Sequence, residues 1–253
     1  MRLLLATLLC LGITQVSAIE LNGRAEFAQQ LALNSSISGR VASIKVSTGQ
    51  QVSAGELLLT FVPTGFQAEA DFAQAHRDSL MPTVDRMQTE MEKAQELFDR
   101  DSLSLVDFNT AEQNLTIAKA KLAAAEAKLE QALFRLSQTE IRAPIGGIVL
   151  DIATYPGQYI NTHASNQTLI TIADNSSMVV NVLIPVEQST YSLLNKAARV
   201  NFQKQNYQGK VVEIGKQASI GSNNYPAVTL QVNFRTDDEL PAGVPVTVVI
   251  ADD

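Results

Sequence analysis

The sequence is poor in the residues that catalysis and metal binding most often use. Its 253 residues include two histidines and one cysteine. His76 and His163 lie 87 positions apart (163 − 76), and neither stands in a recognisable nucleophile or metal motif. The favoured interpretation makes His76 a packing or solvated residue and His163 a surface-loop residue. We therefore predict no enzyme, with no catalytic residue, no metal ligand and no cofactor.

The sequence also lacks a strongly basic stretch, and its net charge is −7. Without clustered Lys and Arg to neutralise phosphates, nucleic acid is excluded as a partner. No apolar run after the first 18 residues is long enough to span a bilayer. Leu3 to Ile13 is apolar but too short for a mature span, and Val16-Ser17-Ala18 has the small residues of a cleavage site. Residues 1–18 are therefore predicted to be a secretory signal peptide.

The one cysteine falls inside this predicted signal peptide. Cleavage after Ala18 would leave an exported, soluble chain without cysteine and hence without a disulfide. Cys10 also suggests a lipid-anchored alternative, but Leu9 stands before it, where lipidation signals need a small residue.

A heptad repeat dominates the middle of the sequence. Large residues recur every seven positions, at Phe108, Leu115, Leu122, Leu129 and Leu136. Three residues after the first four come alanines, at Ala111, Ala118, Ala125 and Ala132. Small alanine side chains let two helices approach closely, so this pattern predicts a helix packed along a coiled-coil seam.

A matching seam precedes the first one and supplies its partner helix. One row holds Phe66, Ala73, Leu80, Met87 and Ala94, and the other holds Ala70, Val84, Met91 and Phe98, interrupted by Arg77. Pro82 is expected to kink or restart this helix on its outer face. Asp99 to Leu103 is the predicted reversal, and Ser104 with Asp107 resembles a capping box. Two helices of about 35 residues predict a hairpin about 50 Å long.

Short glycine-punctuated strands flank the hairpin in two related copies. Gly147, Val149, Ile152, Gly157 and Ile160 match Gly39, Val41, Ile44, Gly49 and Val52 at one offset of 108 (147 − 39). This internal symmetry predicts two halves of a single β module. From Ser177 to Asp253, alternating apolar runs and one short helix around Val186 to Leu194 predict a small antiparallel barrel or sandwich.

These features together resemble the periplasmic adaptor proteins, also called membrane fusion proteins, of efflux pumps and secretion systems. Ser38-Gly39-Arg40-Val41 is similar to the family's first lipoyl half-motif. Thr139 to Gly147 (TEIRAPIGG) is very similar to the signature that follows the hairpin. Leu240-Pro241-Ala242-Gly243-Val244 resembles the final turn of the family's barrel. The motif residues implied to be structural are Gly39, Gly49, Arg142, Ala143, Pro144, Gly147, Gly157 and Gly243.

The resemblance implies an α+β fold: a coiled-coil hairpin inserted into a split lipoyl-like β module, followed by a small β-barrel. The corresponding boundaries are 1–18 for the signal peptide, 19–63 and 139–175 for the lipoyl-like halves, 64–138 for the hairpin and 176–253 for the barrel. The family's membrane-proximal domain is expected to be absent, because few residues precede the first half and the chain stops as the barrel closes.

The resemblance also implies partners and a location. An outer-membrane channel would contact the hairpin tip, and an inner-membrane transporter, first of RND type and alternatively of ABC type, would contact the β domains. A homo-oligomer, either a hexamer or a trimer of dimers, is implied in the periplasm, associated with the inner membrane. Many adaptors carry a tip Arg, a Leu four residues on and a Ser seven beyond. Here Lys93, Leu97 and Ser104 match that spacing, with Lys replacing Arg, and Arg100 completes the candidate contact set.

Two other classes fit less well. A carrier module would present a modifiable lysine between its halves, but the hairpin occupies that junction and no Lys lies between Phe61 and Arg77. A stand-alone periplasmic metal or substrate binder would need ligands, and the N-terminal segment has no Met or His cluster.

Overall fold

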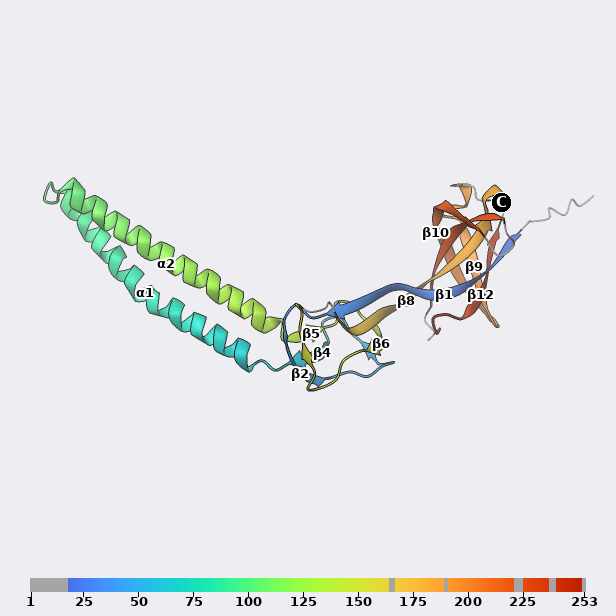
Figure 1. Cartoon of the computed structure of the whole chain (residues 1–253). Coiled ribbons are helices and arrows are strands. Elements are labelled where there is room, and N and C mark those ends of the chain that lie inside the picture. The colour runs from blue at the N-terminus through green and yellow to red at the C-terminus, as the bar shows by residue number, and fades with distance from the viewer. Residues whose placement is uncertain (1–17, 164–166, 189–190, 221–224, 237–239, 252–253) are drawn as a thin grey trace, which may run out of the picture. The chain divides into compact units, whose positions relative to one another are not determined.

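The computed structural model describes residues 18–163, 167–188, 191–220, 225–236 and 240–251, drawn in colour in Figure 1. The predicted signal peptide and Cys10 lie outside the described residues, except that Ala18 begins the first strand. The chain forms two compact units, one containing the described residues up to Leu31 and from Ala173 onward, and the other containing Ala32–Ile172.

The hairpin predicted from the two heptad seams is confirmed. Helix α1 spans Thr64–Asp99 and helix α2 spans Leu105–Ser137, and they lie side by side along their length (Figure 1). The buried residues of both helices are seam residues: Ala70, Ala94, Leu115, Ala118, Ala125 and Ala132. Most of them are alanines, as close packing of two helix backbones requires.

Pro82 does not divide the first helix. α1 continues through it as one element of 36 residues, and Pro82 itself is exposed. Pro82 cannot donate to the carbonyl four residues earlier, and on an exposed face water can bond that carbonyl instead. The expected restart of the helix at this position does not occur.

The offset of 108 residues is reproduced in the strands at the root of the hairpin. Strand β2 (Gly39–Ile44) repeats as β6 (Gly147–Ile152), and β3 (Gln51–Val52) repeats as β7 (Tyr159–Ile160). Each long strand pairs with the short strand of the other half, β2 with β7 and β3 with β6. The two halves therefore form a single β module in which strands of one half pair with strands of the other. The hairpin is inserted between the two halves.

Two further strands connect this module to the helices. Strand β4 (Leu57–Phe61) leads into α1, and β5 (Glu140–Arg142) follows α2. They pair antiparallel in a sheet of order β5-β4-β2-β7. Leu58 and Leu59 of β4 are fully buried, so both helix ends are attached to a packed β core.

The other unit is an antiparallel β structure built from the C-terminal strands. Its elements are β8 (Thr168–Pro185), which belongs to this unit from Ala173 onward, β9 (Ala197–Phe202), β10 (Gln205–Ile220), β11 (Pro226–Arg235) and β12 (Pro245–Ala251). Two single-turn 3₁₀ helices, η1 (Val186–Gln188) and η2 (Tyr191–Leu193), lie where a short helix was expected. The apolar side chains of alternating strand positions, such as Val180, Val182 and Ile184, form its core.

The N-terminal boundary of the lipoyl-like module differs from the predicted 19–63. Strand β1 spans Ala18–Asn34, and its first part pairs with β12, from Ala18 opposite Ala251 to Arg24 opposite Pro245. Ala25 is fully buried in the core of that unit. The segment up to Leu31 thus completes the barrel-like unit rather than the hairpin module.

Candidate functional site at the hairpin tip

The C-terminal end of α1 is closed by a tight turn. The carbonyl of Leu97 accepts a hydrogen bond from the amide of Ser102 at 2.8 Å, and that of Phe98 accepts from Asp101 at 2.9 Å. Asp101 has a φ of 54°, in the left-handed region, which Asp tolerates better than most residues. Two of the last four carbonyls of α1 are therefore satisfied within the turn.

Ser104 is the N-cap of α2, as predicted, and its hydroxyl is hydrogen-bonded there. It accepts a hydrogen bond from the amide of Asp107 at 3.2 Å and donates one to the carboxylate Oδ2 of the same residue at 2.7 Å. An N-cap of this kind satisfies an otherwise unpaired helix amide. Because the hydroxyl hydrogen is used inside the hairpin, Ser104 can offer a partner only an acceptor lone pair.

An aromatic pair joins the two helices just below the turn. The rings of Phe98 and Phe108 stack with centroids 4.8 Å apart and an interplanar angle of 28°. Such a pair contributes about 0.5–1.5 kcal/mol beyond its buried area. Together with the turn hydrogen bonds, it holds the tip of the hairpin in one conformation.

Three of the four predicted contact residues lie along one side of the C-terminal end of α1, where Arg100 is the C-cap residue. Lys93, Leu97 and Arg100 follow one another by four and three positions, which places them on the same helix face. The Arg100 guanidinium pairs with Glu96 Oε1 at 2.6 Å. Lys93 is exposed and, among the described residues, makes no ion pair. The structure brings Ser104 to the same tip, and its role in contacting a partner stays a prediction.

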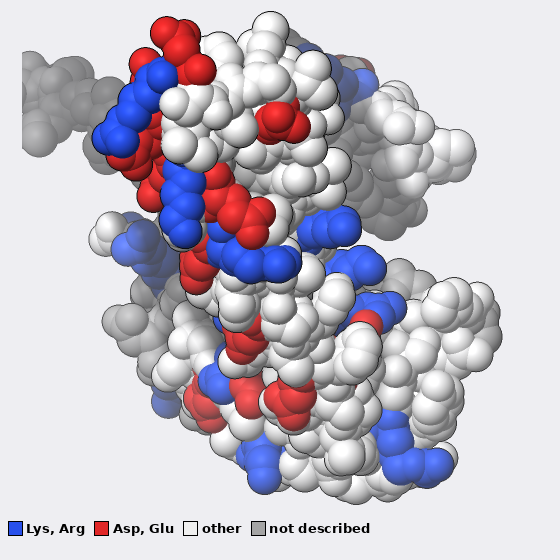
Figure 2. All heavy atoms as spheres, turned by 90° about the vertical axis from the view of Figure 1, so that its left-hand side faces the viewer, with Lys and Arg blue, Asp and Glu red and all other residues white. Residues whose placement is uncertain are grey.

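The most exposed apolar residues of the tip were not in the predicted set. Leu105 is 60% exposed and Val106 is 74% exposed, and Leu97 beside them is 44% exposed. Figure 2 views the molecule from the hairpin end, and its upper part shows charges of both signs along one side with a broad uncharged area next to them. The signal was present in the sequence: Leu105 and Val106 follow the cap but fall outside the heptad seam.

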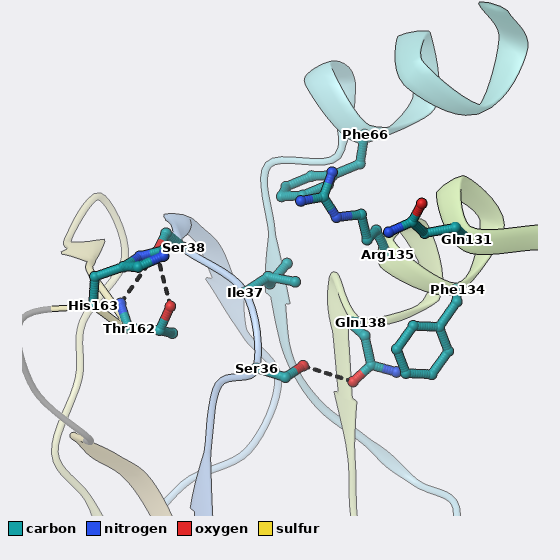
Figure 3. Close-up of a pocket in the computed structure, with 10 residues that line it drawn as sticks. All are labelled: Ser36, Ile37, Ser38, Phe66, Gln131, Phe134, Arg135, Gln138, Thr162 and His163. Atoms are coloured by element: carbon teal, nitrogen blue, oxygen red, sulfur yellow. Dashed lines mark hydrogen bonds between the residues drawn. The ribbon is translucent and has the colours of Figure 1, made fainter. Parts of the chain in front are cut away.

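The root of the hairpin carries a separate pocket of about 420 Å³. Figure 3 shows side chains from both helices and from the β module around it, with Ser38 bonded to Thr162 and Ser36 bonded to Gln138. Arg135 at its rim pairs with Glu69 at 2.8 Å. Its lining combines Phe66 and Phe134 of the two helices with residues of the β module such as Thr162, so the pocket lies at the junction of helix and sheet.

The predicted signature residues fix the turns of the β module beside this junction. Arg142 donates from Nη1 to the carbonyl of Gly55 at 3.0 Å and from Nη2 to Glu140 Oε2 at 2.6 Å. Ala143 is buried, and its carbonyl accepts from the amide of Gly55 at 2.7 Å. Pro144, the next residue, is exposed.

The predicted glycines stand at turns and at strand starts. Gly49, Gly157 and Gly243 have positive φ angles of 85°, 89° and 86°, which glycine adopts without a steric penalty. Gly39 and Gly147 open β2 and β6, and a Cβ on Gly39 would lie 3.3 Å from the ring of Phe61.

Neither a metal site nor a membrane helix is found in the part of the chain that the structure describes. No three His, Cys, Asp or Glu side chains come together there to hold a metal ion. Within the same residues, no helix combines the length and the apolar character needed to cross a bilayer.

One known family model matches the β module and the hairpin together. Residues 29–173 match the profile of the barrel-sandwich hybrid domain of RND MFP proteins. The chain is 30% identical over 153 residues to the uncharacterized protein YdhJ of Escherichia coli K12, covering 60% of this chain and 52% of that one. It is 30% identical over 133 residues to the efflux pump periplasmic linker BepD of Brucella suis biovar 1, covering 53% and 34%. The chain thus spans about half or less of these two relatives.

A solved structure resembles nearly the whole chain. The membrane fusion protein Spr0693 from Streptococcus pneumoniae R6 superposes with a TM-score of 0.72 over 93% of this chain and 99% of that one. The two sequences are 16% identical, so the likeness concerns the fold.

Proposed function

Because the chain belongs to the RND membrane fusion protein family, whose barrel-sandwich hybrid domain covers more than half of it, we propose that it is the adaptor of an efflux complex. In this proposal its hairpin reaches an outer-membrane channel, while its β domains rest on an inner-membrane transporter. Relatives named as an efflux pump periplasmic linker and as macrolide export proteins support the efflux role. The RND profile favours an RND transporter over an ABC one.

The observation that carries the proposal is the construction of the tip. Leu97, Leu105 and Val106 are exposed on a turn held by the Phe98–Phe108 stack and the Ser104 cap. Exposing apolar side chains costs free energy in water unless a partner covers them. Because the turn is ordered by its own contacts, binding would lose little conformational entropy there.

The β module supports the same role from the other end of the helices. Both helices emerge from paired strands, β4 before α1 and β5 after α2. A packed helix pair of about 50 Å with a fixed root holds its tip at a set distance. A strut of this kind suits a protein that bridges two membranes across the periplasm.

The experiment is site-directed crosslinking from the tip in intact cells. Val106→Cys, carrying a short thiol-reactive crosslinker, is expected to capture an outer-membrane channel protein. Ala127→Cys, exposed in the middle of α2, is the matched control and is expected to capture none. Equal capture by both variants, or no outer-membrane adduct from Val106→Cys and Ser104→Cys alike, would count against the proposal.

A further inference from the structure

The pocket at the root of the hairpin has the size of a small-molecule site. Its volume of about 420 Å³ lies within the range of about 300–1,000 Å³ that is common for ligand pockets. Both helices, the segment between β1 and β2, and the residues that follow β7 line it (Figure 3). Four stretches that are distant in the sequence therefore meet around one hollow, and its shape depends on the folded β module as well as on the helices.

Three apolar side chains line the pocket. Ile37 is 8% exposed, Phe66 in the first turn of α1 is partly buried, and Phe134 in the last turn of α2 is 62% exposed. Phe134 stands outside the heptad seam, so the packing of the two helices does not require an aromatic residue there. Its ring adds an apolar wall that gains free energy when another apolar group covers it.

The chain around the pocket is held in place by its own hydrogen bonds. The hydroxyl of Ser35 donates to the carbonyl of Ile37 at 2.6 Å and accepts from the amide of the same residue at 3.2 Å. Ser36 donates to Gln138 Oε1 at 2.8 Å, which joins this segment to the end of α2 (Figure 3). The pocket is thus formed before any ligand enters, and binding there would cost little ordering of the chain.

The lining is positive although the chain as a whole is acidic. The sequence has 26 Asp and Glu residues, but none of those that the structure describes lines this pocket, whereas Arg135 does. A guanidinium has five N–H donors, and Glu69 accepts from Nη1 of Arg135 at 2.8 Å. Among the described residues, Nε and Nη2 of Arg135 have no acceptor. These two groups form a planar fork that matches a carboxylate.

Two other polar side chains complete the lining. Within the described part of the chain, neither the side-chain amide of Gln131 nor the imidazole of His163 has a hydrogen-bond partner. One guanidinium with one amide and one imidazole suits a ligand with a single negative charge, since a polyphosphate would need several cations. A metal ion would need more ligands than the one imidazole supplies.

We propose that this pocket binds a small aromatic carboxylate. The ring lies against Ile37, Phe66 and Phe134, and the carboxylate binds the open fork of Arg135. The pair between Arg135 and Glu69 does not prevent this, because both side chains are about half exposed, at 51% and 47%, and such a surface pair is weak. The ligand site goes beyond the proposed function, which concerns the hairpin tip and requires no bound small molecule.

Two probes that differ in charge test the site with the purified protein. 1-Naphthoate and its uncharged analogue 1-naphthamide carry the same two fused rings. Naphthoate is expected to bind with a Kd on the order of 0.1–1 mM, as its small size allows. Naphthamide is expected to bind about tenfold more weakly, because it forms no charge-assisted pair with Arg135. Saturation-transfer NMR titrations measure both.

Substitutions separate the charged part of the site from the apolar part. Arg135→Gln is expected to weaken naphthoate binding about tenfold and to leave naphthamide binding unchanged. Phe134→Ala is expected to weaken both ligands about fivefold, because it removes an apolar wall. Lys128→Gln and Phe72→Ala are the matched controls, since they remove a cation and an exposed aromatic ring from the neighbouring groove of the hairpin. Both controls should bind the two ligands like the parent.

Circular dichroism should show equal helix content in the parent and all four variants. The proposal is overturned if naphthoate does not bind the parent below about 5 mM, or if naphthamide binds as tightly as naphthoate. It is also overturned if Arg135→Gln weakens both ligands equally, or if the controls lose as much binding as the test variants, which would place the ligand in the groove. Crosslinking from the hairpin tip does not involve this pocket, so the two proposals fail separately.

Discussion

Val41 and Val149 lie 108 positions apart (149 − 41) and make equivalent hydrogen bonds in the two halves of the β module. The amide of Val41 donates to the carbonyl of Gln158 at 2.9 Å, and the amide of Val149 donates to the carbonyl of Gln50 at 3.0 Å. Both valines are 1% exposed. Each half thus completes the other, and the ends of the inserted hairpin are held by one folded base.

This equivalence predicts equal energetic roles for the two valines. Val41→Ala and Val149→Ala are each expected to lower the free energy of unfolding by about 1–3 kcal/mol, because each removes a buried branched side chain. Val106→Ala, at the exposed tip, should change it by less than about 0.5 kcal/mol. Urea denaturation followed by circular dichroism measures all three, and a large difference between Val41→Ala and Val149→Ala would contradict the symmetry.

Close packing at Gly23 gives a prediction specific to the other unit. A Cβ on Gly23 would lie 2.5 Å from Val180 Cγ1 and 2.9 Å from the carbonyl oxygen of Asn181. Gly23→Ala should therefore force β1 away from β8 and increase amide hydrogen exchange in β1 and β12, while the exchange of α1 and α2 stays unchanged.

Gly65→Ala is the matched control for this substitution. Gly65 lies in the first turn of α1, and nothing stands within 4 Å of its added Cβ. Alanine there should stabilise the protein by about 0.5–1 kcal/mol, because it restricts the unfolded chain and favours the helix. If Gly23→Ala behaved like Gly65→Ala, the close contact with β8 would be refuted.

Much of the hairpin module could be predicted because its signals are local and periodic. The alanines of the heptad rows, such as Ala118, Ala125 and Ala132, are buried as the period requires. The offset between Gly39 and Gly147 identified the halves, since a repeated sequence folds into a repeated structure.

The placement of β1 shows the limit of this reasoning. Ile19, Leu21, Ala25 and Phe27 stand at odd positions, and all are at least partly buried, so the alternation of a strand was visible in the sequence. Which sheet edge the strand joins depends on the pairing of Ala18 with Ala251, a contact across almost the entire chain. Local pattern carries no information on a partner so distant. The exposure of Leu105 and Val106 is a different case, because their position outside the heptad seam is already visible in the sequence.

Substitutions of Ser104 can distinguish its role as a helix cap from a direct contact with a partner protein. Ser104→Ala should lower the free energy of unfolding by about 0.5–2 kcal/mol, because the amide of Asp107 loses its acceptor. Ser104→Asn restores a capping oxygen and should recover most of the loss. Efflux activity in cells is the second measurement. Activity that follows stability across both variants indicates capping alone, whereas loss of activity in the stable Ser104→Asn variant indicates a direct contact.

Arg77 is the one charged residue in the heptad rows of the hairpin. Its side chain is 28% exposed and lies 2.8 Å from Asp78 Oδ1 through Nε, but Nε makes no aligned hydrogen bond. Arg77→Leu should therefore raise the free energy of unfolding by about 1 kcal/mol, since an apolar side chain fills the seam without the cost of removing a charge from water.

The matched variant for Arg77→Leu is Arg77→Lys, which keeps the charge and should leave stability near the parent value. Asp78 would lose its partner in the leucine variant, but its side chain is 49% exposed and remains hydrated, so little stability is lost there. Thermal unfolding followed by circular dichroism gives the comparison. A lower melting temperature for Arg77→Leu than for Arg77→Lys would show that the Arg77–Asp78 pair stabilises the hairpin more than apolar packing at the same position.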